Sequence, residues 1–191
     1  MTKAEHPYEL LVIGGSAGSL TAVLKIIQLL GRAITVPIII IFHRKQAEEG
    51  TLIEVLSRRT IYAVKETEDK DDILPSTLYI APADYHVLIE NDRSITLDDS
   101  EKINYSRPSI DVTFESAAEV YGNKLACLLL SGANADGVGG LKAAKASGAF
   151  IAVQDPNDAE VSFMPQQAVD QVEIDFLVDS HNLDKFLDLF R

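Results

Sequence analysis

The chain has 191 residues, 47% hydrophobic and 24% charged, which suits one folded domain rather than a disordered chain. Its net charge of −12 argues against nucleic acid as a partner, because phosphate binding depends on Lys and Arg. The single cysteine, Cys127, excludes an internal disulfide and is expected to be buried. No apolar run approaches the roughly 20 residues that cross a bilayer, and the N-terminus lacks a secretory signal, so we expect a cytoplasmic protein without membrane insertion.

The first third of the chain predicts alternating strands and helices. Strands are expected at 8–13, 36–42 and 61–64, and helices at 19–30 and about 48–58. The first helix places Leu20 and Ile27 among its apolar positions, and Gly31 is expected to close it. Strand, helix and strand at this spacing predict a parallel sheet with right-handed crossovers.

The middle of the chain has a different pattern. Short strands at 77–81, 86–90 and 94–97 predict an antiparallel insertion, in which the last two form a hairpin around residues 91–93. Further elements are expected as helices at 111–121, from the Gly-rich turn to 147, 164–170 and 182–190, and strands at 124–130, 150–153 and 176–178. The prediction is an α/β fold: a three-layer, mostly parallel doubly wound sheet with helices on both faces and a small antiparallel hairpin insertion, in a single domain 1–191.

Three side chains that could carry chemistry follow predicted strands directly. Ser16 follows the first strand, His43 the second, and Asp136 lies in the Gly-rich turn after the strand at 124–130. In open α/β sheets, functional groups collect at the carboxyl ends of the strands. A hydroxyl, an imidazole and a carboxylate at one rim predict a Ser-His-Asp triad for hydrolysis of carboxyl esters.

Each of the three residues also has a plainer interpretation. Ser16 lies in Gly14-Gly15-Ser16-Ala17-Gly18, which matches the G-x-S-x-G pattern of a nucleophile on a strand-to-helix turn. A helix N-cap is an equally good interpretation of this pattern, and a phosphate-binding loop is a further alternative. Taken alone, His43 would be a solvated residue at the rim, and Asp136 a helix cap. A structural role at a strand end is favoured for His86.

The same segments resemble the catalytic domain of bacterial chemotaxis protein-glutamate methylesterases, the CheB-type methylesterases. The resemblance covers about 11–169 and consists of several motifs in the family's order. These motifs are Gly14-Gly15-Ser16-Ala17-Gly18-Ser19, the strand end at His43, Tyr79-Ile80-Ala81-Pro82, Arg107-Pro108-Ser109-Ile110-Asp111, Ser131-Gly132-Ala133-Asn134-Ala135-Asp136-Gly137 and the segment 155–165.

The resemblance implies hydrolysis of glutamate γ-methyl esters on methylated chemoreceptors, which releases methanol, and in some relatives deamidation of receptor glutamines. It implies Ser16 as nucleophile, His43 as base and Asp136 as orienting carboxylate, with no cofactor and no metal. Full-length relatives carry a phosphate-accepting receiver domain before the catalytic domain. None is expected here, because the chain starts close to the first strand, so a receiver would have to be a separate protein.

The substrate and oxyanion vicinity implied by the resemblance contains Ala17, Gly18, Ala133, Asn134 and Arg44. The chain departs from the family here, because Ala17 and Ala133 replace a common threonine and a common methionine. Arg44 and the residue after it replace a Met-Pro pair, and we expect them to help dock an acidic receptor surface. A non-catalytic signalling module on the same fold and a small-molecule esterase remain the alternatives.

Overall fold

The computed structural model describes residues 7–43 and 49–191, and its main feature is a seven-stranded parallel sheet in the order β3-β4-β2-β1-β7-β8-β9. The sheet contains β1 (Leu10–Gly15), β2 (Ile38–Phe42), β3 (Ala63–Glu66), β4 (Thr77–Ile80), β7 (Leu125–Leu129), β8 (Phe150–Gln154) and β9 (Phe176–Val178). The helices are α1 (Leu20–Leu29), α2 (Glu49–Ser57), α3 (Ile110–Tyr121), α4 (Val138–Ala146), α5 (Phe163–Gln171) and α6 (Leu183–Leu187), with short 3-10 turns at Gly122–Lys124 and Asp188–Phe190.

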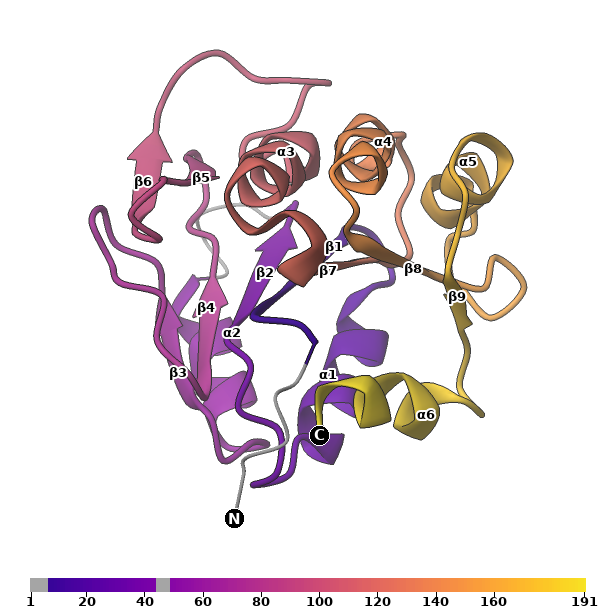
Figure 1. Ribbon diagram of the computed structural model, residues 1–191, viewed down its shortest axis with the longest axis horizontal. Coiled ribbons are helices and arrows are strands. Elements are labelled where there is room, and N and C mark those ends of the chain that lie inside the picture. Colours follow the sequence, from indigo (N-terminus) through magenta and orange to yellow (C-terminus); the bar gives the residue numbers. More distant parts are fainter. Residues whose placement is uncertain (1–6, 44–48) are drawn as a thin grey trace.

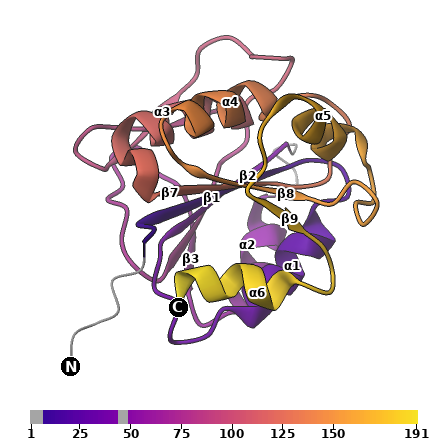
Figure 2. The same cartoon turned by 45° about the vertical axis from the view of Figure 1, so that its right-hand side comes forward.

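The sheet is covered on both faces, which makes three layers. Helices α3, α4 and α5 lie over one face and α1, α2 and α6 over the other (Figures 1 and 2). Each face has its own apolar core, and all residues of the central strands β1, β2 and β7 are buried. This explains the almost continuous runs of Leu and Ile in these strands, because a parallel strand with helices on both sides has no solvent face.

The order of the strands reverses at the centre of the sheet. From β1 the chain passes through α1 to β2 on one side, and from β7 it passes through α4 to β8 on the other. Figure 2 shows α1 and α4 on opposite faces of the sheet. In α/β proteins of this type, ligands bind beyond the carboxyl ends of the strands at such a reversal point, which here lies at β1 and β7.

The predicted antiparallel insertion is smaller in the structure. The segment 77–81 was expected in it, but β4 is a parallel strand between β2 and β3, and all four of its residues are buried. That prediction was wrong because four residues are too few to distinguish an edge hairpin from a covered strand. Among the strands of the described residues, β5 (His86–Ile89) and β6 (Ile95–Asp98) alone pair antiparallel, as the hairpin that the sequence predicts.

The first helix forms as expected, but its buried face differs in detail. Val23, Ile26 and Ile27 are buried, whereas Leu20 is 43% exposed. Gly31 lacks the left-handed conformation of a closing glycine, and the helix ends on an extended Leu30. The remaining expected elements lie within a few residues of their predicted bounds, and Cys127 is buried in β7. Over the described ranges, no helix is long and apolar enough to cross a membrane.

Candidate active site

The three candidate side chains follow neighbouring strands at the carboxyl end of the sheet. Strand β1, which precedes Ser16, pairs with β2 on one side and with β7 on the other. The β1–β2 ladder runs one residue past its last paired residues, because the His43 N–H donates to the Gly15 carbonyl at 3.3 Å. Neighbouring strands lie about 4.8 Å apart, so Ser16 and His43 leave the sheet side by side.

His43 and Asp136 are joined by a short hydrogen bond across 93 residues of sequence. The distance from His43 Nε2 to Asp136 Oδ2 is 2.6 Å, and the two side chains are 13% and 0% exposed. Nε2 therefore carries the proton that Asp136 accepts, and Nδ1 is the ring nitrogen that remains to take a proton. The structure thus brings together the base and the orienting carboxylate that the sequence predicts.

The Asp136 carboxylate lies at the N-terminus of α3. It accepts hydrogen bonds from the backbone N–H groups of Ile110 (2.7 Å) and Asp111 (3.1 Å) and from the Ser109 hydroxyl (2.8 Å). The first N–H groups of a helix have no partner within the helix and favour an anion. Asp136 does act as a cap, but for α3 rather than for α4, which follows it in the sequence.

These contacts decide the charge state of Asp136. Burial alone raises the pKa of a carboxyl group because it disfavours the charged form. The hydrogen bonds from His43 and from the backbone of Ile110 and Asp111 outweigh burial and hold the pKa of Asp136 below its usual value. The carboxylate is therefore ionised at neutral pH and can stabilise a positive charge on the imidazole.

Asp111 makes the reverse connection, from α3 to the N-terminus of α4. Its Oδ1 accepts from the backbone N–H groups of Gly137 (2.9 Å) and Gly140 (2.6 Å). The capping is therefore reciprocal, since Asp136, just before α4, caps α3, and Asp111 of α3 caps α4. Burial raises the pKa of Asp111 to about 6, and the neighbouring Asp136 charge adds to the rise, while the two backbone N–H groups oppose it.

His86 supports the site from behind and does not enter it. The ring is buried, and its Nδ1 accepts from the Ser109 N–H at 3.1 Å. Its Nε2 lies 2.9 Å from the Glu101 carbonyl, to which it donates. His86 therefore fixes the residue that caps α3 and contacts Asp136, which is the structural role expected for it.

Ser16 is held through its backbone. Its N–H donates to the Ser131 carbonyl at 2.9 Å, and its carbonyl accepts from the N–H (3.1 Å) and the hydroxyl (2.6 Å) of Ser19. The N-cap of α1 is Ser19, so the interpretation of Ser16 as the cap was wrong. No hydrogen bond joins the Ser16 hydroxyl to the His43 ring in the described part of the chain, and that contact stays a prediction.

Close packing explains the glycines around Ser16. A Cβ on Gly14 would lie 2.4 Å from a methyl group of Ile110, so glycine lets the start of α3 approach β1. Gly18 has a left-handed φ of 77°, and a Cβ there would lie 2.8 Å from the Ser131 hydroxyl. That hydroxyl is buried, donates to the Ala17 carbonyl at 2.7 Å and accepts from the Val161 N–H at 2.9 Å.

The other residues of the expected substrate vicinity fall into three groups. Ala17 and Ala133 are exposed at the rim. Asn134 has a local role, because its Oδ1 accepts from the Asp136 N–H at 3.1 Å and shapes the loop that carries the carboxylate. Arg44, with the lysine after it, lies outside the described residues. Among the residues that the structure describes, no three His, Cys, Asp or Glu side chains gather as a metal site.

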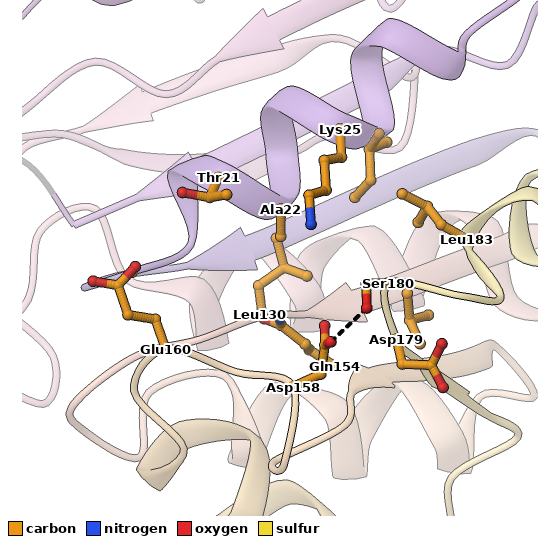
Figure 3. A pocket seen from close by; sticks show the side chains of 13 residues that line it. Thr21, Ala22, Lys25, Leu130, Gln154, Asp158, Glu160, Asp179, Ser180 and Leu183 are labelled. Carbon is orange, nitrogen blue, oxygen red and sulfur yellow. Dashed lines mark hydrogen bonds between the residues drawn. The ribbon is translucent and has the colours of Figure 1, made fainter.

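A pocket of about 190 Å³ adjoins the nucleophile loop on the α1 side of the sheet (Figure 3). Its lining includes Gly18, the amine of Lys25 and the carboxylates of Asp158, Glu160 and Asp179. No candidate triad residue lines it, so the pocket meets the site only at Gly18. Apolar side chains, among them Leu130 and Leu183, complete the lining.

Sequence reasoning missed four supporting roles: those of Ser109, Asp111, Ser131 and Asn134. Ser109 precedes the predicted helix and Asp111 begins it, which is a cap signal, but nothing in the pattern shows that the acceptor is 25 or more residues away. The partners of Ser131 are likewise set by tertiary packing.

Comparisons with known proteins give one consistent result. The family model described as CheB methylesterase matches residues 11–187. A Leptospira interrogans protein, provisionally named a protein-glutamate methylesterase/protein-glutamine glutaminase, is 40% identical over 96% of this chain and 93% of its own length. A Carboxydothermus hydrogenoformans protein named for the same two activities is 38% identical over 85% of this chain, which spans 49% of that relative.

A solved structure agrees with these sequence matches. The crystal structure of the Thermotoga maritima CheB methylesterase catalytic domain superimposes with a TM-score of 0.89 at 29% identity, over 94% of this chain and 97% of that one. The match includes the parallel seven-stranded sheet that carries the candidate residues. On sequence and on structure, the chain belongs to the CheB methylesterase family.

Proposed function

We propose that this chain is a protein-glutamate methylesterase with Ser16 as nucleophile, His43 as general base and Asp136 as the orienting carboxylate. The observation that carries the proposal is the 2.6 Å bond between His43 Nε2 and the buried Asp136, formed beside Ser16 at the reversal point of the sheet. Family membership supports ester hydrolysis as the reaction, and relatives along almost the whole chain carry the methylesterase name.

The reaction follows from the groups in place. His43 Nδ1 takes the proton of the Ser16 hydroxyl while Oγ attacks the γ-carbonyl carbon of the glutamyl methyl ester. The protonated imidazole, stabilised by Asp136, then gives this proton to the leaving methoxide, which departs as methanol. A water molecule, deprotonated by the same nitrogen, attacks the acyl-enzyme, releases the glutamate carboxylate and restores Ser16.

Backbone N–H groups beside Ser16 are suited to hold the oxyanion. The N–H groups of Ala17 and Gly18 donate to no other group in the described part of the chain, and they precede the first turn of α1. Such groups stabilise the charge of a tetrahedral intermediate without reorganisation. They would also compensate for a missing threonine hydroxyl at position 17, which the family resemblance leads one to expect.

The same acyl chemistry accommodates a second leaving group. If the substrate is a glutamine amide, protonated His43 gives its proton to the amide nitrogen, which departs as ammonia, and this accounts for relatives named for both activities. The protein substrate that the family implies is a methylated chemoreceptor.

The test is methanol release from a methylated receptor fragment by the wild type beside Ser16→Ala. We expect the variant to lose turnover by a factor of about 10⁴ or more, because the nucleophile cannot be replaced. Ser147→Ala, which removes an exposed hydroxyl at the other end of α4, is the matched control and should be fully active.

A serine-reactive phosphonate separates the alternatives. Labelling of the wild type but not of Ser16→Ala supports catalysis at Ser16, and no labelling at all would favour a non-catalytic module. Turnover of simple esters without any methanol from the receptor fragment would favour a small-molecule esterase.

A further inference from the structure

The segment between β6 and α3 displays an aromatic ring to solvent. Tyr105 is 99% exposed, and Ile103 beside it is 41% exposed. Figure 1 shows this segment as an arch that leaves the body of the protein beyond α3. Single exposed apolar residues are ordinary on protein surfaces, so exposure alone assigns no role to the ring.

The backbone that carries the ring gives a second observation. Ile103 and Ser106 exchange two backbone hydrogen bonds of 3.1 and 2.9 Å, which closes a two-residue turn. Both central residues are left-handed, with φ of 50° at Asn104 and 63° at Tyr105. Such turns favour Asn followed by Gly, because a side chain with a Cβ is strained in this conformation. Position 105 therefore carries a large aromatic side chain in a backbone conformation that favours glycine.

The turn is also tied to the catalytic apparatus. Asn104 Nδ2 donates to Asp111 Oδ2 at 2.9 Å, and the Asp111 N–H donates to Asp136 at 3.1 Å. Tyr105 precedes Ser109 by four residues, which limits their separation to about 14 Å. The ring therefore has a defined place beside the helix end that holds Asp136.

The base of the arch is braced independently of the turn. Arg107 Nη1 donates to the carbonyls of Asp99 (2.6 Å) and Ser100 (2.7 Å), which closes the segment across its base. A strained turn held at both ends costs free energy, and such features persist where the displayed group has a function.

We propose that Tyr105, with Ile103, is a docking element that packs on an apolar surface of the protein substrate beside the ester-bearing residue. The inference rests on the proposed function. A glutamyl ester would enter the rim at Ser16, and the turn is linked through Asn104 and Asp111 to the Asp136 side of that rim, so the ring lies where a protein substrate that extends beyond the rim would pass. Tyr is one of the side chains that most often supply binding energy in protein recognition.

The test replaces Tyr105 by the residue that the turn prefers. Tyr105→Gly removes the ring while relieving the left-handed strain, so the variant is expected to fold at least as stably as the wild type. For methanol release from the receptor fragment, we expect kcat/KM to fall about tenfold, mainly through KM. Hydrolysis of p-nitrophenyl acetate should stay within twofold, and Tyr105→Phe should keep most receptor activity.

Ser76→Gly is the matched control, because Ser76 is also left-handed (φ 54°) but precedes β4 at the opposite end of the sheet. It should leave both activities unchanged. Affinity for the receptor fragment is measured separately in a Ser16→Ala background, so docking is tested whether or not the ester is cleaved, and a loss of affinity with Tyr105→Gly supports the proposal.

Three results would overturn docking by Tyr105. The first is receptor turnover and affinity unchanged in Tyr105→Gly. The second is an equal loss with p-nitrophenyl acetate, which would place the effect at the catalytic groups. The third is a wild-type dimer that dissociates in Tyr105→Gly, which would assign the ring to a second copy of this chain. If the wild type releases methanol from the receptor fragment in any of these cases, the proposed function is unaffected.

Discussion

Ser16 and Asp136 occupy the same rim but are held in different ways. Asp136 is fixed by its side chain, which accepts four hydrogen bonds, from His43, Ser109, Ile110 and Asp111. Ser16 is fixed by its backbone at both the N–H and the carbonyl, and its hydroxyl has no such network among residues 7–43 and 49–191.

The difference matches the roles proposed for Ser16 as nucleophile and Asp136 as orienting carboxylate. An orienting carboxylate works by staying ionised and still, so dense hydrogen bonding serves it. A nucleophile must rotate to meet its base and then form a bond to carbon, so only the backbone around it can be rigid. The rigid parts of the site are therefore the backbone that carries Ser16 and the hydrogen bonds around the Asp136 carboxylate.

The largest effect expected within this comparison is that of Asp136→Asn. The amide has the shape of the carboxylate but cannot stabilise the imidazolium, and it presents an NH₂ group to donors on α3. We expect kcat for methanol release to fall by about 10³ to 10⁴. Thermal unfolding in parallel shows whether the fold is kept, and a folded variant with kcat within tenfold of wild type would contradict the role of Asp136.

The second prediction sets Ser109→Ala against Ser131→Ala. Each change removes one buried hydroxyl, and each should lower kcat/KM about tenfold. Loss of the Ser109 donor raises the pKa of Asp136, so the acid limb of the pH–rate profile should move to higher pH. Ser131→Ala frees the Ala17 carbonyl and the Val161 N–H without touching the carboxylate, so its acid limb should stay in place. An equal shift of the acid limb in both variants would show that the groups around Asp136 and those around Ser131 do not act independently.

The smallest effect concerns stability and comes from Asp111. Its pKa rises from 3.8 in the unfolded chain to about 6 in the fold, so the folded state holds this proton more tightly. The free energy of unfolding should therefore decline as pH rises from about 4 to above 6. Asp111→Asn cannot titrate, and relative to wild type it should gain about 1–2 kcal/mol over that range, after allowance for solvent screening.

Urea unfolding of both proteins at pH 4, 5, 6 and 7 measures this difference. Asn keeps a carbonyl oxygen for the backbone of α4 but loses the hydrogen bond from Asn104, so the pH dependence of the difference, rather than its absolute size, isolates the charge. A difference that does not change with pH would show that burial at Asp111 is too weak to disturb its titration.

The sequence predicts the three candidate residues of this site better than the residues that hold them in place. Ser16, His43 and Asp136 were identified because each follows a strand of a parallel sheet, and the topology alone brings such positions together. The assignment of β4 to the antiparallel insertion was wrong because its four residues contain no signal for parallel or antiparallel pairing. The contacts of Ser109 with Asp136 lie beyond pattern analysis, since they depend on how close α3 approaches β1, which a missing side chain at Gly14 permits.

The reciprocal capping of α3 and α4 has a consequence for judging distant relatives. Asp136 closes the end of one helix as well as serving the imidazole, so a descendant that had lost catalysis would still need it to fold. Survival of this aspartate in an alignment then says little about activity. Ser16 and His43 cap no helix in the described structure, so under the proposed mechanism their loss would mark an inactive copy.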